Sequence, residues 1–210
     1  MQKEKVYQGR DALHNALAQT YIGKCFSAYG FYLPPIQELL PAIPLNDGFI
    51  DNLFLLTDGT YVFVDYTSEY HKTDMAQYPN YIAKIMEKYD KGDGNFDLHL
   101  IIIYTGDVEK ADPVLDCGCL TLRPKQVFLS RMDGGAEFDA IRQKIHSGIV
   151  LTDDDLMKLV VLPLSVPGPE RKTQLFEKIS SLAGEISDET QRNFALSAMA
   201  LATEKFIDRE

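Results

Sequence analysis

The stretch that most constrains the fold is residues 49–69, where two apolar, β-branched and aromatic runs flank a Thr-Asp-Gly turn at residues 57–59. Runs of this kind on either side of a glycine-containing turn predict a β-hairpin. Each predicted strand carries one aspartate at a position where a strand is normally apolar, Asp51 in the first and Asp65 in the second. Whether these two carboxylates meet depends on the length of the turn.

The sequence leaves two registers open. A three-residue loop with Gly59 in the left-handed conformation places Asp51 opposite Asp65. A two-residue loop places Asp51 opposite Tyr66, and the two carboxylates then lie on opposite faces of the sheet. Two facing carboxylates repel each other, and a hard divalent ion such as Mg²⁺ would relieve that repulsion. The competing interpretation is that one aspartate lies at a solvated strand end.

Helices and a buried strand are expected on either side of the hairpin. Apolar periodicity predicts one helix over residues 9–26 and another over residues 73–89, in which Pro79 either occupies the first turn or makes a kink. The predicted apolar stripe of the second helix comprises Met75, Tyr78, Ile82, Met86 and Tyr89. The most apolar run of the chain, residues 98–104, follows directly and predicts a central strand buried on both faces.

The second half of the chain is expected to be mainly helical. Two short strands are predicted at residues 120–122 and 127–129, followed by a helix over residues 136–145. Thr152 is a predicted helix cap because three aspartates follow it. We therefore divide the chain into an α/β core, residues 1–148, and a helical C-terminal subdomain, residues 149–210, that packs on the sheet or on another copy of the chain.

The charge balance argues against a protein whose whole surface binds nucleic acid. The chain has 31 acidic and 21 basic residues and a formal net charge of −10, whereas neutralising phosphates requires basic side chains. Local basic groups remain, namely Arg123, Lys125 and Arg131, and also Arg142 with Lys144. No apolar run approaches the roughly 20 residues that span a bilayer, and the N-terminal residues have no signal-peptide core. We therefore expect a cytoplasmic protein without a membrane partner.

The three cysteines, Cys25, Cys117 and Cys119, do not indicate a disulfide framework. Cys117 and Cys119 flank Gly118 and could contribute to a soft-metal or redox site, but no second Cys or His pair at zinc spacing accompanies them. We interpret them as structural or incidental free thiols.

The order of helix, acidic hairpin, helix and buried strand resembles the core of the PD-(D/E)XK nuclease superfamily, and more closely its transposase-like, recombination-promoting nuclease branch. The resemblance covers roughly residues 10–205, and because each motif is short, their order and spacing carry most of it. The stretches that carry it are Ile50-Asp51, Asp58-Gly59, Val-Phe-Val-Asp-Tyr-Thr at residues 62–67, Tyr-Ile-Ala-Lys-Ile at residues 81–85, residues 98–104 and residues 151–164.

The resemblance implies a fold, a reaction and a metal site. The fold is α/β, a restriction-endonuclease-like core with a central mixed sheet flanked by helices, plus a helical C-terminal extension. The reaction is hydrolysis of DNA phosphodiester bonds, dependent on Mg²⁺ or Mn²⁺, in the mobile-element or recombination class. Asp51 and Asp65 would hold the ion, and the backbone carbonyl of Tyr66 would complete the site. Such an ion polarises the phosphoryl oxygen and lowers the pKa of bound water.

The chain departs from the family pattern at Thr67, where the family has lysine or, in this branch, glutamine. A threonine hydroxyl can hydrogen-bond a water molecule but cannot supply a cation. Lys84 or Gln77, from the following helix, and Lys72 are candidates for a relocated partner. Glu69 would share the face of Asp65 if the strand continues, and it could then be a further oxygen ligand. The alternative function is a catalytically inactive relative that serves as an interaction or assembly module, including a homo-oligomer formed through the C-terminal helices.

Overall fold

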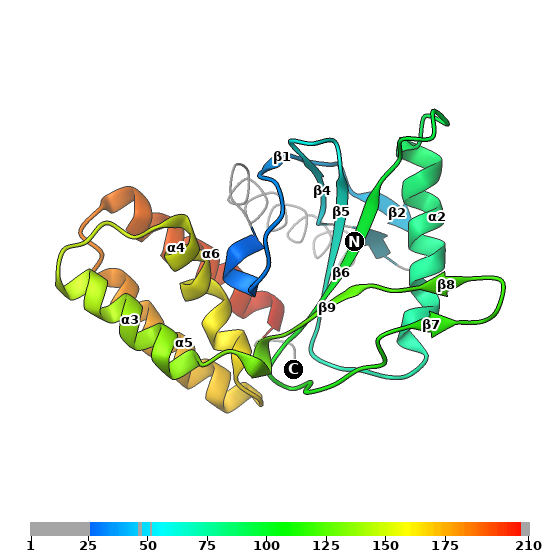
Figure 1. Ribbon diagram of the computed structural model, residues 1–210. Helices are drawn as coiled ribbons and strands as arrows, with labels where there is room; N and C mark the ends of the chain where they lie inside the picture. Colours follow the sequence, from blue (N-terminus) through cyan, green and yellow to red (C-terminus); the bar gives the residue numbers. More distant parts are fainter. Residues whose placement is uncertain (1–25, 46–47, 51, 207–210) are drawn as a thin grey trace, which may run out of the picture.

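The computed structural model describes residues 26–45, 48–50 and 52–206. It is an α/β structure in which the central mixed sheet has helices on both faces (Figure 1). Residues 9–25 of the first predicted helix lie outside the described residues. None of the helices in the described part of the chain is both long enough and apolar enough to cross a membrane.

The central sheet has the strand order β1-β4-β5-β6-β9. Its strands are β1 Ile36–Leu39, β4 Leu53–Leu56, β5 Tyr61–Thr67, β6 Leu98–Tyr104 and β9 Lys125–Phe128. The pairs β1–β4 and β4–β5 are antiparallel, whereas β5–β6 and β6–β9 are parallel. Two small antiparallel pairs accompany the sheet, β2 Ile43–Leu45 with β3 Gly48–Ile50 and β7 Leu115–Asp116 with β8 Thr121–Leu122. The run predicted to be central is indeed β6, and its last five residues are buried.

The hairpin adopts the three-residue loop. The backbone N–H of Leu56 donates to the carbonyl of Thr60 at 2.9 Å, and Gly59 has a φ of +90°. A side chain at that φ is strained, which is why the turn requires glycine. The two-residue register, which would have set Asp51 opposite Tyr66, is therefore excluded.

The first arm of the hairpin is not one continuous strand. β3 and β4 belong to different sheets, and Asn52 between them has a φ of 53°. The hairpin ladder nevertheless reaches this point, because the N–H of Val64 donates to the carbonyl of Asn52 at 3.0 Å. Asp51 lies outside the described residues, so its pairing with Asp65 stays a prediction.

A parallel β–α–β unit, β5–α2–β6, forms the next part of the chain. The 3₁₀ helix η2 Asp74–Gln77 leads into α2 Tyr78–Tyr89, with Pro79 in the first turn, one of the two positions predicted for it. Thr73 makes no side-chain capping hydrogen bond to this segment. Tyr78 and Ile85 are the buried residues of α2, whereas Met86 is 42% exposed, so the predicted stripe is wrong at Met86. α2 covers one face of the sheet (Figure 1).

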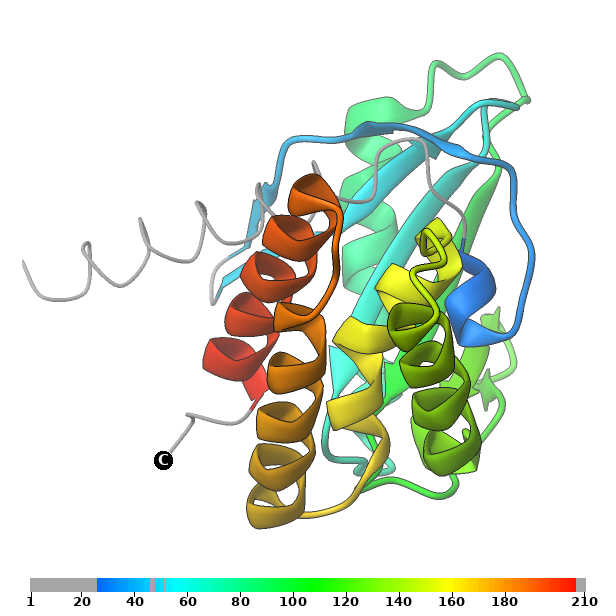
Figure 2. The same cartoon turned by 90° about the vertical axis from the view of Figure 1, so that its left-hand side faces the viewer.

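The opposite face of the sheet is covered by a layer of helices, seen in front of the strands in Figure 2. They are η1 Phe26–Tyr29, η3 Leu129–Arg131, α3 Gly134–His146, α4 Asp153–Val161, η4 Leu162–Ser165, α5 Pro169–Gly184 and α6 Glu189–Phe206. Val161 and Leu164 join the core under this face of the sheet, next to Val62 and Ile101. The helices also have a second hydrophobic cluster of their own. That cluster includes residues of α3, and the predicted division at residues 148 and 149 stays a prediction.

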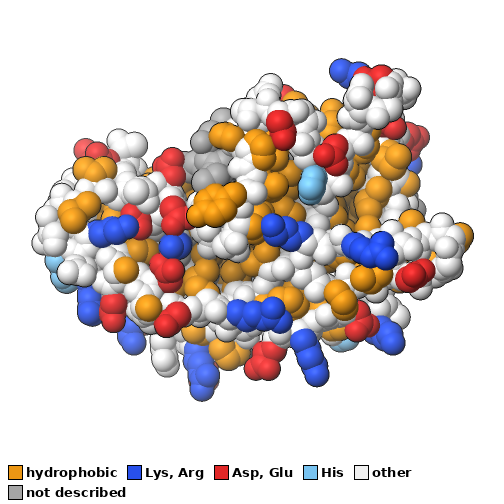
Figure 3. Space-filling view, viewed as in Figure 1, with side chains coloured by type: hydrophobic (Ala, Val, Ile, Leu, Met, Phe, Trp, Pro, Cys, Tyr) orange, Lys and Arg blue, Asp and Glu red, His pale blue; other side chains and the backbone are white. Residues whose placement is uncertain are grey.

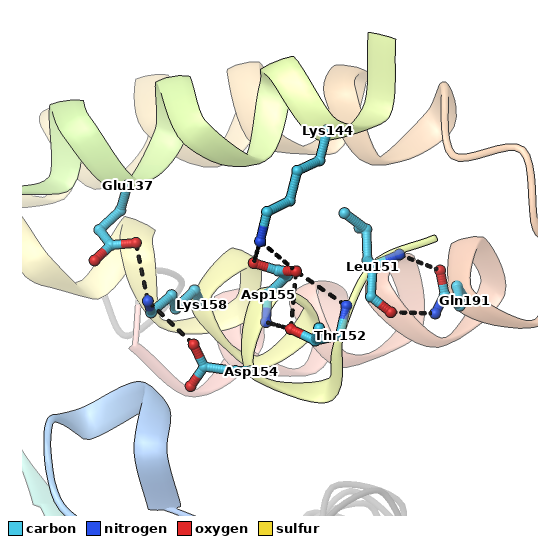
Figure 4. Close-up of polar contacts among 8 residues, drawn as sticks. All are labelled: Glu137, Lys144, Leu151, Thr152, Asp154, Asp155, Lys158 and Gln191. Atoms are coloured by element: carbon cyan, nitrogen blue, oxygen red, sulfur yellow. Dashed lines mark hydrogen bonds and ion pairs between the residues drawn. The ribbon is translucent and has the colours of Figure 1, made fainter. Parts of the chain in front are cut away.

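Polar contacts fix the start of α4 (Figure 4). The Thr152 hydroxyl accepts from the N–H of Asp155 at 3.2 Å, and a carboxylate oxygen of Asp155 accepts from the N–H of Thr152 at 2.9 Å. This reciprocal capping box confirms the predicted cap. Lys144 of α3 donates to both oxygens of the same carboxylate, at 2.6 and 2.9 Å. The ion pair between Lys144 and Asp155 therefore joins α3 to α4.

A second junction joins the sheet to the helical layer at the end of β6. The backbone N–H of Gly106 donates to the carbonyl of Leu164 at 2.7 Å. The next residue, Asp107, pairs with the buried ammonium of Lys172 and accepts the N–H of Gly168 at 2.8 Å. These contacts bring the backbones of β6 and η4 together at this point.

Candidate functional site

The β–α–β unit creates a pocket where β5 ends and the chain turns towards α2. In open α/β sheets ligands bind beyond the carboxyl ends of the strands, because the crossover leaves a crevice there. The pocket encloses about 270 Å³, part of it open to solvent. Its polar lining residues are Asp65, Thr67, Glu69, Asp74 and Gln77, and the others are Tyr70, Met75, Tyr78 and Tyr104.

Asp65 lies on the α2 face of the sheet. Along β5, Phe63 belongs to the core beneath α2, whereas Val62 and Val64 belong to the core beneath the helical layer. The alternation of a strand then directs Asp65 towards α2. The hydroxyl of Tyr78 donates to Oδ2 of Asp65 at 2.6 Å, a short, charge-assisted hydrogen bond.

The pocket has a negative electrostatic field. Burial raises the pKa of Tyr78 well above its ordinary value, and the charge and hydrogen bond of Asp65 raise it further. Burial raises the pKa of Tyr104 to about 12, with added contributions from Tyr70, Asp65 and Asp74. Burial and the charge of Asp65 also raise the pKa of Tyr81. Burial is the largest cause of all three shifts, and the negative charge of Asp65 adds to each of them, from α2 and from β6.

The other predicted site residues fall into two groups. Gln77 lines the pocket, and its Oε1 accepts from the Tyr81 hydroxyl at 3.0 Å. A hydrogen bond from its side chain to Tyr78 acts against the rise in the pKa of that phenol. Lys84 does not line it, since the Lys84 ammonium pairs with Glu87 at 2.9 Å on the exposed face of α2. The side chain of Tyr66 points to the opposite face of the sheet, where its hydroxyl lies 2.7 Å from that of Tyr29.

Thr67 and Glu69 form a local turn. The hydroxyl of Thr67 donates to the carbonyl of Glu69 at 2.8 Å and accepts its N–H at 3.2 Å. β5 ends at Thr67, so the strand does not continue to Glu69 as its predicted role required. The Glu69 side chain reaches the pocket lining nevertheless, 3.5 Å from His71 and 78% exposed.

The oxygen atoms of Asp65, Glu69 and Asp74 are donors of the kind that Mg²⁺ prefers. Among the described residues, no group of three His, Cys, Asp or Glu side chains is arranged to hold one ion. Asp51 lies outside the described residues. Carboxylate oxygens are therefore present at the pocket, but the described carboxylates alone do not form a metal-binding group.

A basic strip begins next to the pocket. The ring of Tyr104 stacks on that of Phe128 at 4.9 Å, and the guanidinium of Arg131 lies 4.3 Å from the Phe128 ring. Arg123 precedes β9, the edge strand, Lys125 is its first residue and Arg131 follows it in η3; all three are exposed, and we call them the β9 basic strip. The Lys125 ammonium lies 4.2 Å from the Phe31 ring, on the face of the sheet that the helical layer covers, whereas Arg131 lies on the pocket side. Within the ranges that the structure describes, none of the three pairs with a carboxylate. Figure 3 shows Lys and Arg side chains interspersed with Asp and Glu side chains along the lower part of the view.

The tyrosines of the pocket make stability depend on pH in alkaline solution. Below about pH 10 tyrosine is neutral in both the folded and the unfolded chain, so the stability due to Tyr78 and Tyr104 is fully present. As the pH rises above 10, the unfolded chain loses protons that the folded chain retains, and the free energy of unfolding falls. We expect Tyr78→Phe to make this fall shallower. Denaturant titrations from about pH 9 to about pH 11 measure it, and equal slopes for both proteins would contradict it.

Comparison of the chain with protein-family models, with curated proteins and with solved structures gives no match. The fold and the pocket define the class: an α/β protein with a mixed central sheet and an acidic pocket at the carboxyl end of β5.

Proposed function

We propose that the protein is a divalent-metal-dependent hydrolase of DNA phosphodiester bonds, with its active site in the pocket at the end of β5. The observation that carries the proposal is the position of Asp65. It lies near the carboxyl end of β5, in a pocket that Glu69 and Asp74 also line, and after burial its charge adds to the raised pKa of Tyr78 and of Tyr104. Carboxylates in such a position suit an ion that activates water for attack on phosphate.

The finer class follows the resemblance to PD-(D/E)XK nucleases of the transposase-like, recombination-promoting branch. An antiparallel hairpin that leads into a parallel β–α–β unit supports a restriction-endonuclease-like core. Asp65 and Asp51 would hold Mg²⁺ or Mn²⁺ with the backbone carbonyl of Tyr66, and Glu69 would add an oxygen. The ion would supply Lewis-acid polarisation of the phosphoryl oxygen and a water molecule of lowered pKa.

Gln77 is the residue we assign to the position left open by Thr67. Its amide nitrogen carries two N–H donors at the pocket wall, of which Tyr78 takes one, whereas the Thr67 hydroxyl is already bonded to the Glu69 backbone. A neutral donor can orient a water molecule or a phosphate oxygen, and it stabilises developing charge less than an ammonium group does. Lys84 keeps a role only if its ion pair with Glu87 opens.

The β9 basic strip is the surface we assign to the DNA backbone. Its Arg131 end adjoins the pocket through Phe128 and Tyr104, so a phosphate chain bound at Arg131 would lie near the carboxylates, and Lys125 would contact the chain further along the sheet edge. In the described part of the chain no carboxylate neutralises the charge of these three side chains, although Arg131 also donates to the carbonyl of Glu109 at 3.3 Å. The strip reconciles a net charge of −10 with a nucleic-acid substrate, because only this edge need be basic.

We expect replacement of Arg123, Lys125 and Arg131 by alanine to weaken DNA binding about equally for all sequences. The slope of log affinity against log salt concentration should fall by about 3, one for each lost phosphate contact. Fluorescence anisotropy of a labelled duplex across a salt series measures it. Arg142→Ala is the matched control, because this arginine pairs with Asp139 at 2.9 Å. An unchanged slope in the triple variant would mean that DNA does not bind along this edge of the sheet.

Two contacts favour a second candidate function, a non-catalytic module. Asp65 accepts the Tyr78 hydroxyl at 2.6 Å, and the Thr67 hydroxyl donates to the carbonyl of Glu69 within a turn. Asp65 and Thr67 therefore each have a structural role that requires no catalysis. In that case the protein would act through its surfaces, with homo-oligomerisation through α5 and α6 as the leading arrangement.

Plasmid nicking by the purified chain across a Mg²⁺ titration tests the proposal. Nicking that requires the ion and stops on chelation supports the hydrolase. Mn²⁺ binding is measured in parallel by calorimetry. Absence of both nicking and ion binding would overturn the hydrolase and leave the interaction module.

A further inference from the structure

The β7–β8 hairpin carries two thiols at its tip, and neither of them lines the pocket. The last strand pair is Asp116 with Thr121, and the connecting loop is Cys117-Gly118-Cys119-Leu120. Leu115 and Leu122 at the base of the hairpin pack against the core beneath α2. The hairpin itself extends away from the sheet (Figure 1). Cys117 and Cys119 are both free and both exposed.

A three-residue turn holds these cysteines together. The N–H of Cys119 donates to the carbonyl of Cys117 at 3.1 Å, the i to i+2 hydrogen bond of a γ-turn. Gly118 at its centre has a φ of +83°, which suits the form of this turn with a positive central φ. The Asp116 carboxylate accepts the N–H of Gly118 at 3.0 Å, and the N–H of Cys117 donates to Leu120 at 3.0 Å.

The turn brings the two cysteines within reach of a disulfide bond. Residues two positions apart span about 7 Å when the chain is extended, and a turn closed by a hydrogen bond shortens that span. A disulfide requires Cα atoms about 4.4–6.8 Å apart. The thiol of Cys117 lies 3.5 Å from the carbonyl of Leu120, a weak contact that costs little to break.

We propose that Cys117 and Cys119 form a reversible dithiol–disulfide couple whose substrates are low-molecular-weight disulfides. One thiolate attacks a sulfur of the small disulfide, forms a mixed disulfide and releases one small thiolate. The second cysteine thiolate then attacks the protein sulfur of that mixed disulfide and releases the other small thiolate. Two electrons pass from the protein to the small disulfide, two thiol protons leave the protein, and the ring through Gly118 closes.

A substitution at Gly118 tests the proposed couple without changing either cysteine. A Cβ at this position would meet no atom within 4 Å, so Gly118→Ala changes only the backbone preference. Alanine disfavours the positive φ that holds the turn, and the equilibrium constant for ring closure should fall about tenfold. Gly92→Ala is the matched control, since Gly92 also has a positive φ, +71°, with no atom within 4 Å.

The experiment equilibrates the full chain with glutathione buffers of increasing oxidised fraction, quenches it with acid and maps the disulfides by mass spectrometry. We expect a Cys117–Cys119 peptide lacking two hydrogen atoms, re-reduced by excess glutathione. Cys119→Ser should stop at the mixed disulfide on Cys117. Gly92→Ala should match the natural chain, and Gly118→Ala should need a more oxidising buffer. Stable mixed disulfides in the natural chain, pairing with Cys25, or equal behaviour of the two glycine variants would overturn the proposal.

Discussion

Replacing Asp65 with asparagine is expected to lower Mg²⁺-dependent nicking of plasmid DNA by more than about 100-fold, because a metal ligand is lost. Asparagine has the same shape and keeps one side-chain oxygen. That oxygen can still accept the Tyr78 hydroxyl, which donates to Asp65 at 2.6 Å. The fold should therefore survive, and circular dichroism with a denaturant titration checks that it does.

Asp93→Asn is the control for the Asp65 substitution. Asp93 lies in the turn between α2 and β6, where its Oδ1 accepts the N–H of Asn95 at 3.0 Å. The change removes the same charge and keeps the same kind of hydrogen bond away from the pocket. Nicking should be unchanged in this control. Equal nicking by Asp65→Asn and the natural chain would place the activity elsewhere or in a contaminant.

Gly106→Ala is expected to lower the free energy of unfolding by about 3 kcal/mol or more. A Cβ on Gly106 would lie 2.3 Å from the carbonyl oxygen of Ser165 and 2.5 Å from the carbonyl carbons of Ser165 and Val166. These are backbone atoms, so no side chain can rotate to make room. The hydrogen bond from Gly106 to Leu164 would be lost with the displacement, and so would the alignment of Asp107 with Lys172.

Gly184→Ala provides the matched control for the glycine experiment. Gly184 is the last residue of α5, and a Cβ there would have no neighbour within 4 Å. Alanine has a higher helix propensity than glycine, so stability should be unchanged or raised by up to about 1 kcal/mol. Urea denaturation of both variants measures the difference. Equal stabilities would mean that β6 and η4 do not approach so closely.

Local chemistry made the hairpin predictable from the sequence. A glycine with positive φ at residue 59 fits both a two-residue and a three-residue loop, so the sequence predicts the hairpin and leaves its register open; the hydrogen bond from Leu56 to Thr60 shows the three-residue loop. The capping box at Thr152 is likewise encoded within four residues. The register beyond Asn52 could not be predicted, because the chain bends there and β3 pairs with β2 instead.

The buried face of α2 shows where periodicity misleads. Steps of four residues, from Tyr78 to Ile82 to Met86, advance by about 40° each around a helix of 3.6 residues per turn. After two such steps the predicted stripe has left the buried face. Ile85 is therefore fully buried and Met86 is 42% exposed.

The pocket depends on contacts between elements that are distant in sequence. Asp74, Tyr78 and Tyr104 were not predicted as site residues, since each belongs to a different element and no local motif links them to Asp65. One available signal was the parallel β5–α2–β6 unit, which places the end of β6 beside the end of β5. The bond from Thr67 to Glu69 also had a local signal, because threonine hydroxyls commonly bond to backbone groups two residues away.

A crystal structure of the protein soaked with Mn²⁺, with anomalous diffraction, tests the central claim most directly. The account predicts an anomalous peak about 2.0–2.6 Å from a carboxylate oxygen of Asp65, with a carboxylate oxygen of Asp51 on the same ion. An ordered pocket without a peak at saturating Mn²⁺, or with the Asp51 and Asp65 carboxylates on opposite faces of the sheet, would contradict it.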